Sequence, residues 1–333
     1  NDMNTSTSAE KEWLKKVQTG KPEAASSENK KEQKSSSAPM GSSGSTTEKK
    51  PKRGFKDVAG MDELKTLITE SFINVLNNRE IAQAYGILPP SLMFYGPAGC
   101  GKTFFAEKVA EEVGVNFMKV VPDDIASKWV HGTQEKIAEV FRKAERNAPT
   151  LLFFDEFDAM VPARTGEDHH NQNNEVNEFL CMMNNASEKG IYIIAATNHP
   201  ENIDKAALRT GRIDELIYID MPDKASRESL FRLSLSKLPA SDDIDYEKLA
   251  DMTSGYNCSD ISNIVKVASR KMFNESIAQK DQPYKLITQI QLEEAIKHKS
   301  PSVSQRDLRE YERVRGEFSP KDEGRKPIAI GFH

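Results

Sequence analysis

Short apolar runs alternate with amphipathic stretches between residues 54 and 221. Runs of four or five largely apolar residues, typical of buried strands, lie at residues 92–95, 117–121, 151–154, 191–195 and 216–219. Apolar positions with helical spacing lie between them, near residues 104–113, 135–147 and 176–183. Because this alternation is typical of parallel strands joined by helices, we expect an α/β fold whose parallel sheet is covered by helices on both faces.

The pattern changes after the segment Met221-Pro222-Asp223. From there the apolar positions follow helical spacing only, at residues 226–235, 246–252, 259–279 and 289–297. We therefore predict a large α/β domain over residues 54–221 and a small all-helical domain over residues 222–318. A C-terminal tail is predicted over residues 319–333.

Composition sets the first 53 residues apart from the rest. They are rich in Ser, Lys and Glu, and such a stretch cannot bury enough apolar surface to offset its loss of conformational entropy. We predict a disordered tether over residues 1–53. The first residue is Asn1 rather than Met, so an N-terminal recognition domain outside this sequence stays an open alternative.

Charge and cysteine content narrow the function classes. Residues 1–53 carry 11 Lys and Arg against 7 Asp and Glu, whereas the remainder is acidic, with 35 against 44. An acidic body argues against tight binding to nucleic acid, which needs basic residues to neutralise phosphates. No apolar run approaches the roughly 18 residues of a membrane span, and three scattered cysteines are typical of free thiols in a reducing cytoplasm.

One motif carries specific chemistry. A strand-like run ending at Tyr95 is followed by a Gly-rich loop and then by a helical pattern, which is the context required of a phosphate-binding P-loop. Its backbone N–H groups and the helix N-terminus can bind phosphates, the Lys can reach the β- and γ-phosphates, and the Thr hydroxyl can bind Mg²⁺. The sequence therefore predicts ATP and Mg²⁺ as cofactors, with the loop residues Gly96, Pro97, Ala98, Gly99, Cys100, Gly101, Lys102 and Thr103.

Two later strand ends complete the predicted site. Asp155 and Glu156 follow a buried strand, where Asp155 is expected to bind the Mg²⁺ and its waters and Glu156 to polarise the attacking water. Asn198 follows another strand and could hold that water or a γ-phosphate oxygen; the alternative is an Asn that only forms a turn before His199-Pro200.

Cys100 lies inside the phosphate-binding loop. The helix N-terminus could lower the pKa of its thiol and make it reactive toward alkylating reagents. The alternative is a small, buried and inert side chain, and the sequence does not choose between the two.

The order of these motifs resembles the AAA ATPases, in particular the branch of valosin-containing protein, katanin and spastin. The likeness extends from Phe55 to about Phe318 and includes the segments 55–60, 86–90 and 208–214. The resemblance implies that the backbone of Val58, Ala59 and Gly60 holds adenine. It also implies that Arg209 and Arg212 act as arginine fingers in the active site of a neighbouring subunit.

The helical domain also carries a family motif. Residues 253–261 resemble the family's lid segment, which implies that Cys258 and Ser259, together with Phe104 after the phosphate-binding loop, contribute to the nucleotide site. Asn257 and Cys258 replace the usual Ser and Gly, so we expect the approach of this backbone to the nucleotide to differ. Residues 301–311 resemble the C-terminal helix of the same branch.

A further position implied by the resemblance is the substrate pore. Lys128, Trp129 and Val130 stand where the family has a basic, aromatic and aliphatic triplet that points into the central channel of a hexamer. An exposed Trp on a loop needs a reason, and an aromatic face can grip many polypeptide sequences. The alternative is a Trp that packs on its own domain. The family continues with an acidic pattern, which His131-Gly132-Thr133-Gln134 replaces.

These features together predict a cytoplasmic, ring-forming ATPase, implied by the resemblance to be a hexamer, that threads, unfolds or disassembles protein substrates. Two alternatives stay open. The chain could be the ATPase partner of a separate protease, since it contains no His-Glu-x-x-His zinc peptidase motif of its own. It could also be a nucleotide-gated adaptor or a loader that acts on DNA.

Overall fold

Five short apolar stretches form one parallel sheet in the computed structural model, which describes residues 54–125, 132–163, 170–278 and 284–318. The strand order is β2-β3-β4-β1-β5, and every pairing is parallel. The strands are β1 (Leu92–Tyr95), β2 (Asn116–Val120), β3 (Thr150–Phe154), β4 (Ile191–Thr197) and β5 (Glu215–Tyr218). Every residue of β1, β3 and β4 is buried, which is why these strands read as continuous apolar runs. The predicted α/β fold with a parallel sheet is confirmed.

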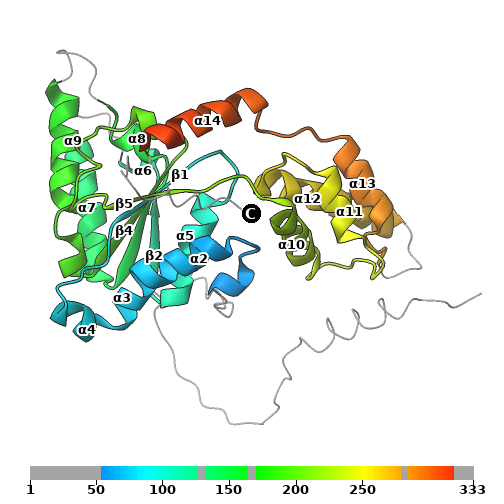
Figure 1. Ribbon diagram of the computed structural model, residues 1–333, viewed down its shortest axis with the longest axis horizontal. Coiled ribbons are helices and arrows are strands. Elements are labelled where there is room, and N and C mark those ends of the chain that lie inside the picture. Colours follow the sequence, from blue (N-terminus) through cyan, green and yellow to red (C-terminus); the bar gives the residue numbers. More distant parts are fainter. Residues whose placement is uncertain (1–53, 126–131, 164–169, 279–283, 319–333) are drawn as a thin grey trace, which may run out of the picture.

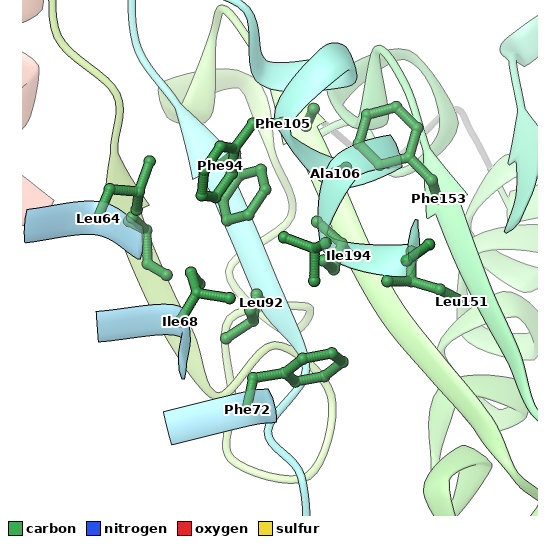
Figure 2. Close-up of a cluster of buried hydrophobic side chains, with 14 of the residues drawn as sticks. Leu64, Ile68, Phe72, Leu92, Phe94, Phe105, Ala106, Leu151, Phe153 and Ile194 are labelled. Carbon is green, nitrogen blue, oxygen red and sulfur yellow. The ribbon is translucent and has the colours of Figure 1, made fainter. Parts of the chain in front are cut away.

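Helices cover one face of this sheet with side chains that interdigitate with those of the strands. Leu64, Ile68 and Phe72 lie along one side of this core, and Phe105 lies beside Phe94 (Figure 2). All five have at most 2% of their surface exposed. Burying each of these side chains stabilises the fold by about 1.5–3 kcal/mol. The helices of this region are α2 (Asp62–Ile68), the π-helix η2 (Thr69–Ile73), α3 (Asn74–Asn77), α4 (Arg79–Ala84) and α5 (Lys102–Val113).

A second helical layer, which includes α7 (Gly132–Arg146) and α9 (His170–Met183), covers the opposite face (Figure 1). Its core is aromatic: the ring of Phe179 lies 5.0 Å from that of Phe154 and 5.9 Å from that of Phe157. The elements of this region are α6 (Pro122–Ile125), α7 (Gly132–Arg146), α8 (Phe157–Met160), α9 (His170–Met183), η3 (Ala186–Lys189) and η4 (Pro200–Asn202).

The described residues after β5 form helices around a separate core. Phe231, Leu249 and Ile261 are fully buried there. Asp223 and Asp245 cap the first two helices by accepting backbone N–H bonds at 2.7 and 3.0 Å. The helices of this lid region are α10 (Lys224–Leu235), α11 (Tyr246–Met252), α12 (Cys258–Ala278) and α13 (Gln289–Lys297).

The last described helix, α14 (Gln305–Phe318), returns from the lid region to the α/β part (Figure 1). The Arg315 guanidinium lies 4.8 Å from the ring of Tyr218 and 3.7 Å from Asp220 Oδ2, while the ring of Phe318 lies 6.2 Å from that of Tyr95. α14 thereby joins the two parts close to the ends of β1 and β5. Within the described ranges no helix combines the length and the apolar character that a bilayer crossing needs.

Candidate active site

The loop between β1 and α5 turns tightly through three glycines with positive φ. Gly96, Gly99 and Gly101 have φ angles of 136°, 77° and 93°. A Cβ at Gly96 would lie 2.2 Å from the Ile219 carbonyl oxygen, and one at Gly99 would lie 2.4 Å from the Asn257 amide nitrogen. Only glycine fits at these two positions, and the loop leads directly into the N-terminus of α5, an arrangement that binds anions well.

The Lys102 side chain folds over this loop. It is 8% exposed, and its ammonium donates hydrogen bonds to the carbonyl oxygens of Gly96 at 2.8 Å and Pro97 at 2.9 Å. Burial lowers the pKa of Lys102 to about 8. A buried cation beside a phosphate-sized cradle is suited to a phosphate oxygen, which would replace the hydration that burial removes.

The predicted Mg²⁺ ligands lie together at the carboxyl end of the sheet. The Thr103 hydroxyl, at the start of α5, donates to Asp155 Oδ2, at the end of β3, at 3.1 Å. A hydroxyl and a carboxylate are the hard oxygen ligands that Mg²⁺ prefers, so this pair fits the ion.

Glu156 has a backbone conformation that is uncommon for its residue type. Its φ is 52°, in the left-handed region, and its N–H donates to Asp155 Oδ1 at 3.2 Å. Such a conformation costs a non-Gly residue about 1–3 kcal/mol and recurs at functional sites. The turn carries the exposed Glu156 side chain out of the strand direction at the edge where Thr103 and Asp155 meet.

Asn198 lies one residue beyond the same edge. The Thr197 hydroxyl donates to Asp158 Oδ1 at 2.6 Å and accepts from the His199 N–H at 2.8 Å, which holds the end of β4 against α8. Because Thr197 is in register with Tyr95, the half-buried Asn198 follows β4 at the level where the phosphate-binding loop follows β1. The sheet therefore brings the three predicted elements of the site to one edge.

A cavity of about 560 Å³ lies between this loop and the lid region. Its volume is in the range of small-ligand sites. Six of the residues predicted to bind nucleotide line it: Ala59, Gly99, Gly101, Phe104, Cys258 and Ser259.

Val58 and Gly60 flank Ala59 without lining this cavity. Val58 is 7% exposed and belongs to the core beneath. A Cβ at Gly60 would lie 2.2 Å from Ser226 Oγ, so this glycine allows the segment to approach α10 closely. The backbone of residues 58–60 is thus held between the sheet and the lid region.

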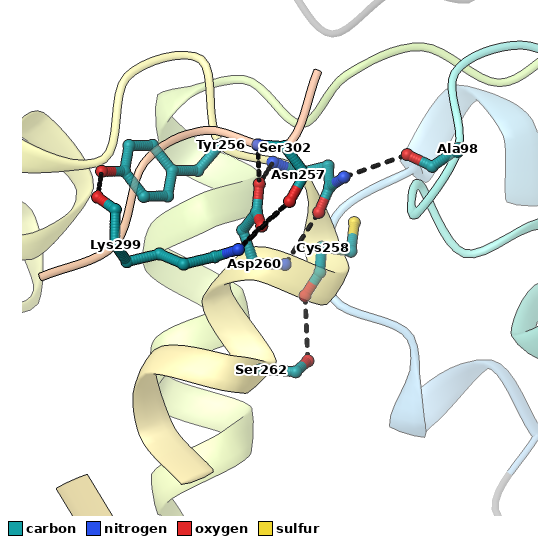
Figure 3. A network of polar contacts seen from close by, with 8 residues as sticks. All are labelled: Ala98, Tyr256, Asn257, Cys258, Asp260, Ser262, Lys299 and Ser302. Atoms are coloured by element: carbon teal, nitrogen blue, oxygen red, sulfur yellow. Dashed lines mark hydrogen bonds and ion pairs between the residues drawn. The ribbon is translucent and has the colours of Figure 1, made fainter. Parts of the chain in front are cut away.

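The lid region contacts the phosphate-binding loop through the two positions that depart from the family pattern. Asn257 Nδ2 donates to the Ala98 carbonyl at 3.0 Å (Figure 3). Cys258 Sγ lies 3.7 Å from the Cys100 carbonyl oxygen. Asn257 Oδ1 also accepts from the Asp260 N–H at 2.7 Å. Side chains at these two positions hold the lid against the loop together with the backbone N–H of Ser259, which donates to the Gly99 carbonyl at 3.0 Å.

Behind this contact a buried carboxylate joins α12 to the segment before α14. Asp260 is 2% exposed; it pairs with Lys299 Nζ at 2.7 Å, accepts from the Ser302 N–H at 2.9 Å and also bonds the Ser302 hydroxyl (Figure 3). Burial alone would raise the pKa of Asp260, but the hydrogen bonds from Lys299 and Ser302 outweigh it, so the pKa lies below its ordinary value. Asp260 therefore stabilises the fold in its charged form.

We expect Asp260→Asn to lower the free energy of unfolding by about 2 kcal/mol at pH 7, since bonds to a charged acceptor are lost. Because the folded pKa is depressed, this stabilisation is present above about pH 4 and is lost as the pH falls through the folded pKa. The gap between wild type and variant in urea unfolding, followed by circular dichroism, should therefore narrow below pH 4. Asp242→Asn, at an exposed lid carboxylate, is the control; a gap independent of pH would contradict the role of the charge.

The environment of the Cys100 thiol contradicts one of the two expectations for this residue. Its side chain is fully buried, and Sγ lies 3.6 Å from Met221 Sδ. Burial, with a smaller contribution from the nearby Cys258, raises the pKa of the Cys100 thiol well above its ordinary value. The expected lowering of this pKa is therefore wrong, because the sulfur points into the core rather than toward the helix N-terminus, and the inert alternative is favoured.

The two candidate arginine fingers differ in their surroundings. Arg209 is exposed on the segment between β4 and β5. Arg212 is half-buried, and its guanidinium donates to the Ala206 carbonyl at 2.8 Å and to Asn184 Oδ1 at 3.4 Å. Arg209 is thus the more accessible of the two, while Arg212 also holds its own segment in place.

The predicted pore residues Lys128, Trp129 and Val130 lie outside the described residues, as does His131. The alternatives for Trp129 therefore stay as the sequence leaves them.

One residue of the site was missed from the sequence. Lys119 Nζ lies 2.7 Å from Asp155 Oδ2. The available signal was strand alternation, since a charged residue near the end of a strand whose neighbour ends in an acidic pair can face that pair.

Comparisons with known proteins match the observed architecture. The profile of the ATPase family associated with various cellular activities (AAA) matches residues 92–221, and that of the AAA+ lid domain matches residues 243–283. The chain is 36% identical over 279 residues to a cell division cycle protein 48 homolog of Archaeoglobus fulgidus. That alignment covers 80% of this chain and 38% of the relative, so the chain spans little more than a third of the relative's length.

Proposed function

Since this chain belongs to the AAA ATPase family, we propose that it is the motor of a ring-forming ATPase that uses Mg²⁺-dependent ATP hydrolysis to thread, unfold or disassemble proteins. The observation that carries the proposal is the convergence of Lys102, Thr103, Asp155 and Glu156 at one edge of the sheet, beside a cavity that residues of the lid region help to line. The proposed unit comprises the large domain over residues 54–221 and the lid domain over residues 222–318.

Each side chain has a separate role in hydrolysis. Lys102 binds and orients the β- and γ-phosphate oxygens, and Thr103 and Asp155 hold Mg²⁺, which neutralises phosphate charge when bound. Glu156 accepts a proton from the attacking water, and the neutral amide of Asn198 orients that water or a γ-phosphate oxygen.

Assembly would complete the site. An exposed guanidinium at Arg209 can neutralise the charge that develops on the transferred phosphoryl group of a neighbouring subunit, and Arg212 lies three residues away on the same segment. We propose a homo-oligomeric ring, with six subunits as the family resemblance implies. Its three free cysteines suit the reducing cytoplasm.

The proposed substrate is a polypeptide gripped by Lys128, Trp129 and Val130 in the pore. The acidic composition of residues 54–333 favours this over a DNA substrate. Stimulation of the ATPase by an unfolded polypeptide and not by DNA would support threading, whereas stimulation by DNA alone would favour the loader alternative. Degradation of the substrate only when a separate peptidase is added would identify the protease-partner alternative.

We expect Trp129→Ala to leave basal ATP hydrolysis within a few-fold of wild type and to abolish unfolding of a tagged fluorescent protein. Trp129 belongs to no phosphate motif, so its loss removes grip without harming hydrolysis. Trp129→Phe, which keeps an aromatic face, should retain most of the unfolding rate.

The melting temperature of Trp129→Ala distinguishes a role of Trp129 in gripping substrate from a role in packing on its own domain. A Trp that packs on its own domain would cost about 3–5 kcal/mol of stability when removed, and the variant would melt early. Unfolding by Trp129→Ala at the wild-type rate would contradict the grip.

A further inference from the structure

Two polar groups meet at a single carboxylate oxygen in the active site. Asp155 Oδ2 accepts from the Thr103 hydroxyl at 3.1 Å and pairs with Lys119 Nζ at 2.7 Å. The Asp155 side chain is 23% exposed and that of Lys119 is 42% exposed. The Lys119 ammonium therefore already lies against the oxygen that is proposed to hold Mg²⁺.

The sheet fixes this arrangement. Lys119 on β2 is in register with Phe153 on β3, and Asp155 follows Phe153 by two residues, on the same face. The Asp155 N–H donates to the Val120 carbonyl at 3.0 Å, which carries the pairing of the two strands past the end of β3. Two residues earlier in each strand, on the same face, the rings of Phe117 and Phe153 stack with their centroids 5.8 Å apart. The ammonium thus reaches Asp155 from a position set by backbone pairing and by packing.

An exposed ion pair normally contributes little, because water screens it. The Lys119–Asp155 pair differs from a fully exposed pair in its location. Its acceptor is mostly buried and lies beside the Thr103 hydroxyl at the start of α5. A cation that enters between Thr103 and Asp155 must share Oδ2 with Lys119 or displace it. Two positive charges at one oxygen repel each other strongly where the surroundings are only partly solvated.

We propose that Lys119 is a positioning residue that competes with Mg²⁺ for Asp155, an inference that rests on the proposed Mg²⁺ site. Without the metal, Lys119 neutralises Asp155 and so lessens its repulsion of nucleotide phosphates. With the metal, Lys119 opposes binding. Lys119 thereby weakens Mg²⁺ binding, strengthens binding of metal-free nucleotide, and reduces the difference in affinity between the two nucleotide forms.

The test measures the affinity of a fluorescent, non-hydrolysable ATP analogue by anisotropy, in EDTA and at buffered free Mg²⁺ concentrations. For Lys119→Ser we expect the free Mg²⁺ concentration that gives half of the affinity gain to fall roughly fivefold to tenfold. In EDTA the same variant should bind the analogue several-fold more weakly than wild type. A variant that merely damages the sheet would weaken both forms together, so the opposite directions identify competition.

Matched variants sharpen the result. Lys119→Arg keeps the charge and should stay close to wild type. Lys143→Ser removes one exposed lysine from the last turn of α7, at the opposite edge of the sheet, and should change neither value. In an Asp155→Asn background, Lys119→Ser should shift the Mg²⁺ dependence less than twofold, because the shared carboxylate is gone.

Two outcomes overturn the inference: a Mg²⁺ dependence of Lys119→Ser within twofold of wild type, or an equal shift in the Asp155→Asn background. Failure of the proposed function looks different. Wild-type protein whose analogue affinity does not respond to Mg²⁺ at all would refute the Mg²⁺ site itself, and with it the competition.

Discussion

Replacing Arg209 with alanine should lower the ATPase rate of the assembled ring by about 10³-fold, because an arginine finger neutralises charge that develops only in the transition state. Nucleotide binding by each subunit should be nearly unchanged, since Arg209 is exposed and does not line the cavity of its own chain. Steady-state ATPase assays and analogue binding on the same preparation give both values.

Mixing experiments test whether the finger acts on a neighbour. Arg209→Ala subunits added to wild type should reduce activity by more than their share of the mixture, and the wild-type rate per subunit should rise steeply with protein concentration. Arg146→Ala, at an exposed position in the last turn of α7, is the matched control for loss of a guanidinium. Full turnover by a monomer, identified by sedimentation, would contradict action in trans. Arg212→Ala is a less clean test, since it also removes the bond to the Ala206 carbonyl.

Glu156→Gln should keep ATP binding and lower turnover by about 10²-fold or more, because an amide cannot accept the proton of the attacking water. Lys102→Ala should instead abolish binding, since it removes the buried ammonium of the phosphate-binding loop. The two variants therefore fail at different steps, which analogue binding and single-turnover hydrolysis distinguish.

An isosteric control is available for the first of these. Glu145→Gln changes an exposed carboxylate near the end of α7 and should leave hydrolysis at the wild-type rate. Near wild-type hydrolysis by Glu156→Gln would remove Glu156 from the mechanism. Trapped substrate on Glu156→Gln rings would in addition identify what the motor acts on.

The sequence by itself determined the strands and most of the helices. Four-residue runs such as Leu92–Tyr95 lie inside a parallel sheet that is covered on both faces. Because both faces of such a strand are buried, its residues are consecutively apolar, and this pattern is visible in the sequence. The phosphate-binding loop was equally predictable, because its glycines precede Lys102 and Thr103 at fixed spacing between a strand pattern and a helix pattern. The short helices before β1 were not predicted, since they are brief and interrupted, and they gain stability mainly from packing on the sheet.

Only the tertiary structure decided how residues distant in sequence act on one another. The sequence left a reactive and an inert Cys100 equally open, and the direction of its side chain into the core beside Met221 favours the inert thiol. The role of Lys119 depends on the register between β2 and β3, and that of Asn257 on the docking of the lid against Ala98. Periodicity and motifs report local preferences of the backbone, whereas burial and charge pairing are set by side chains that meet only after the chain has folded.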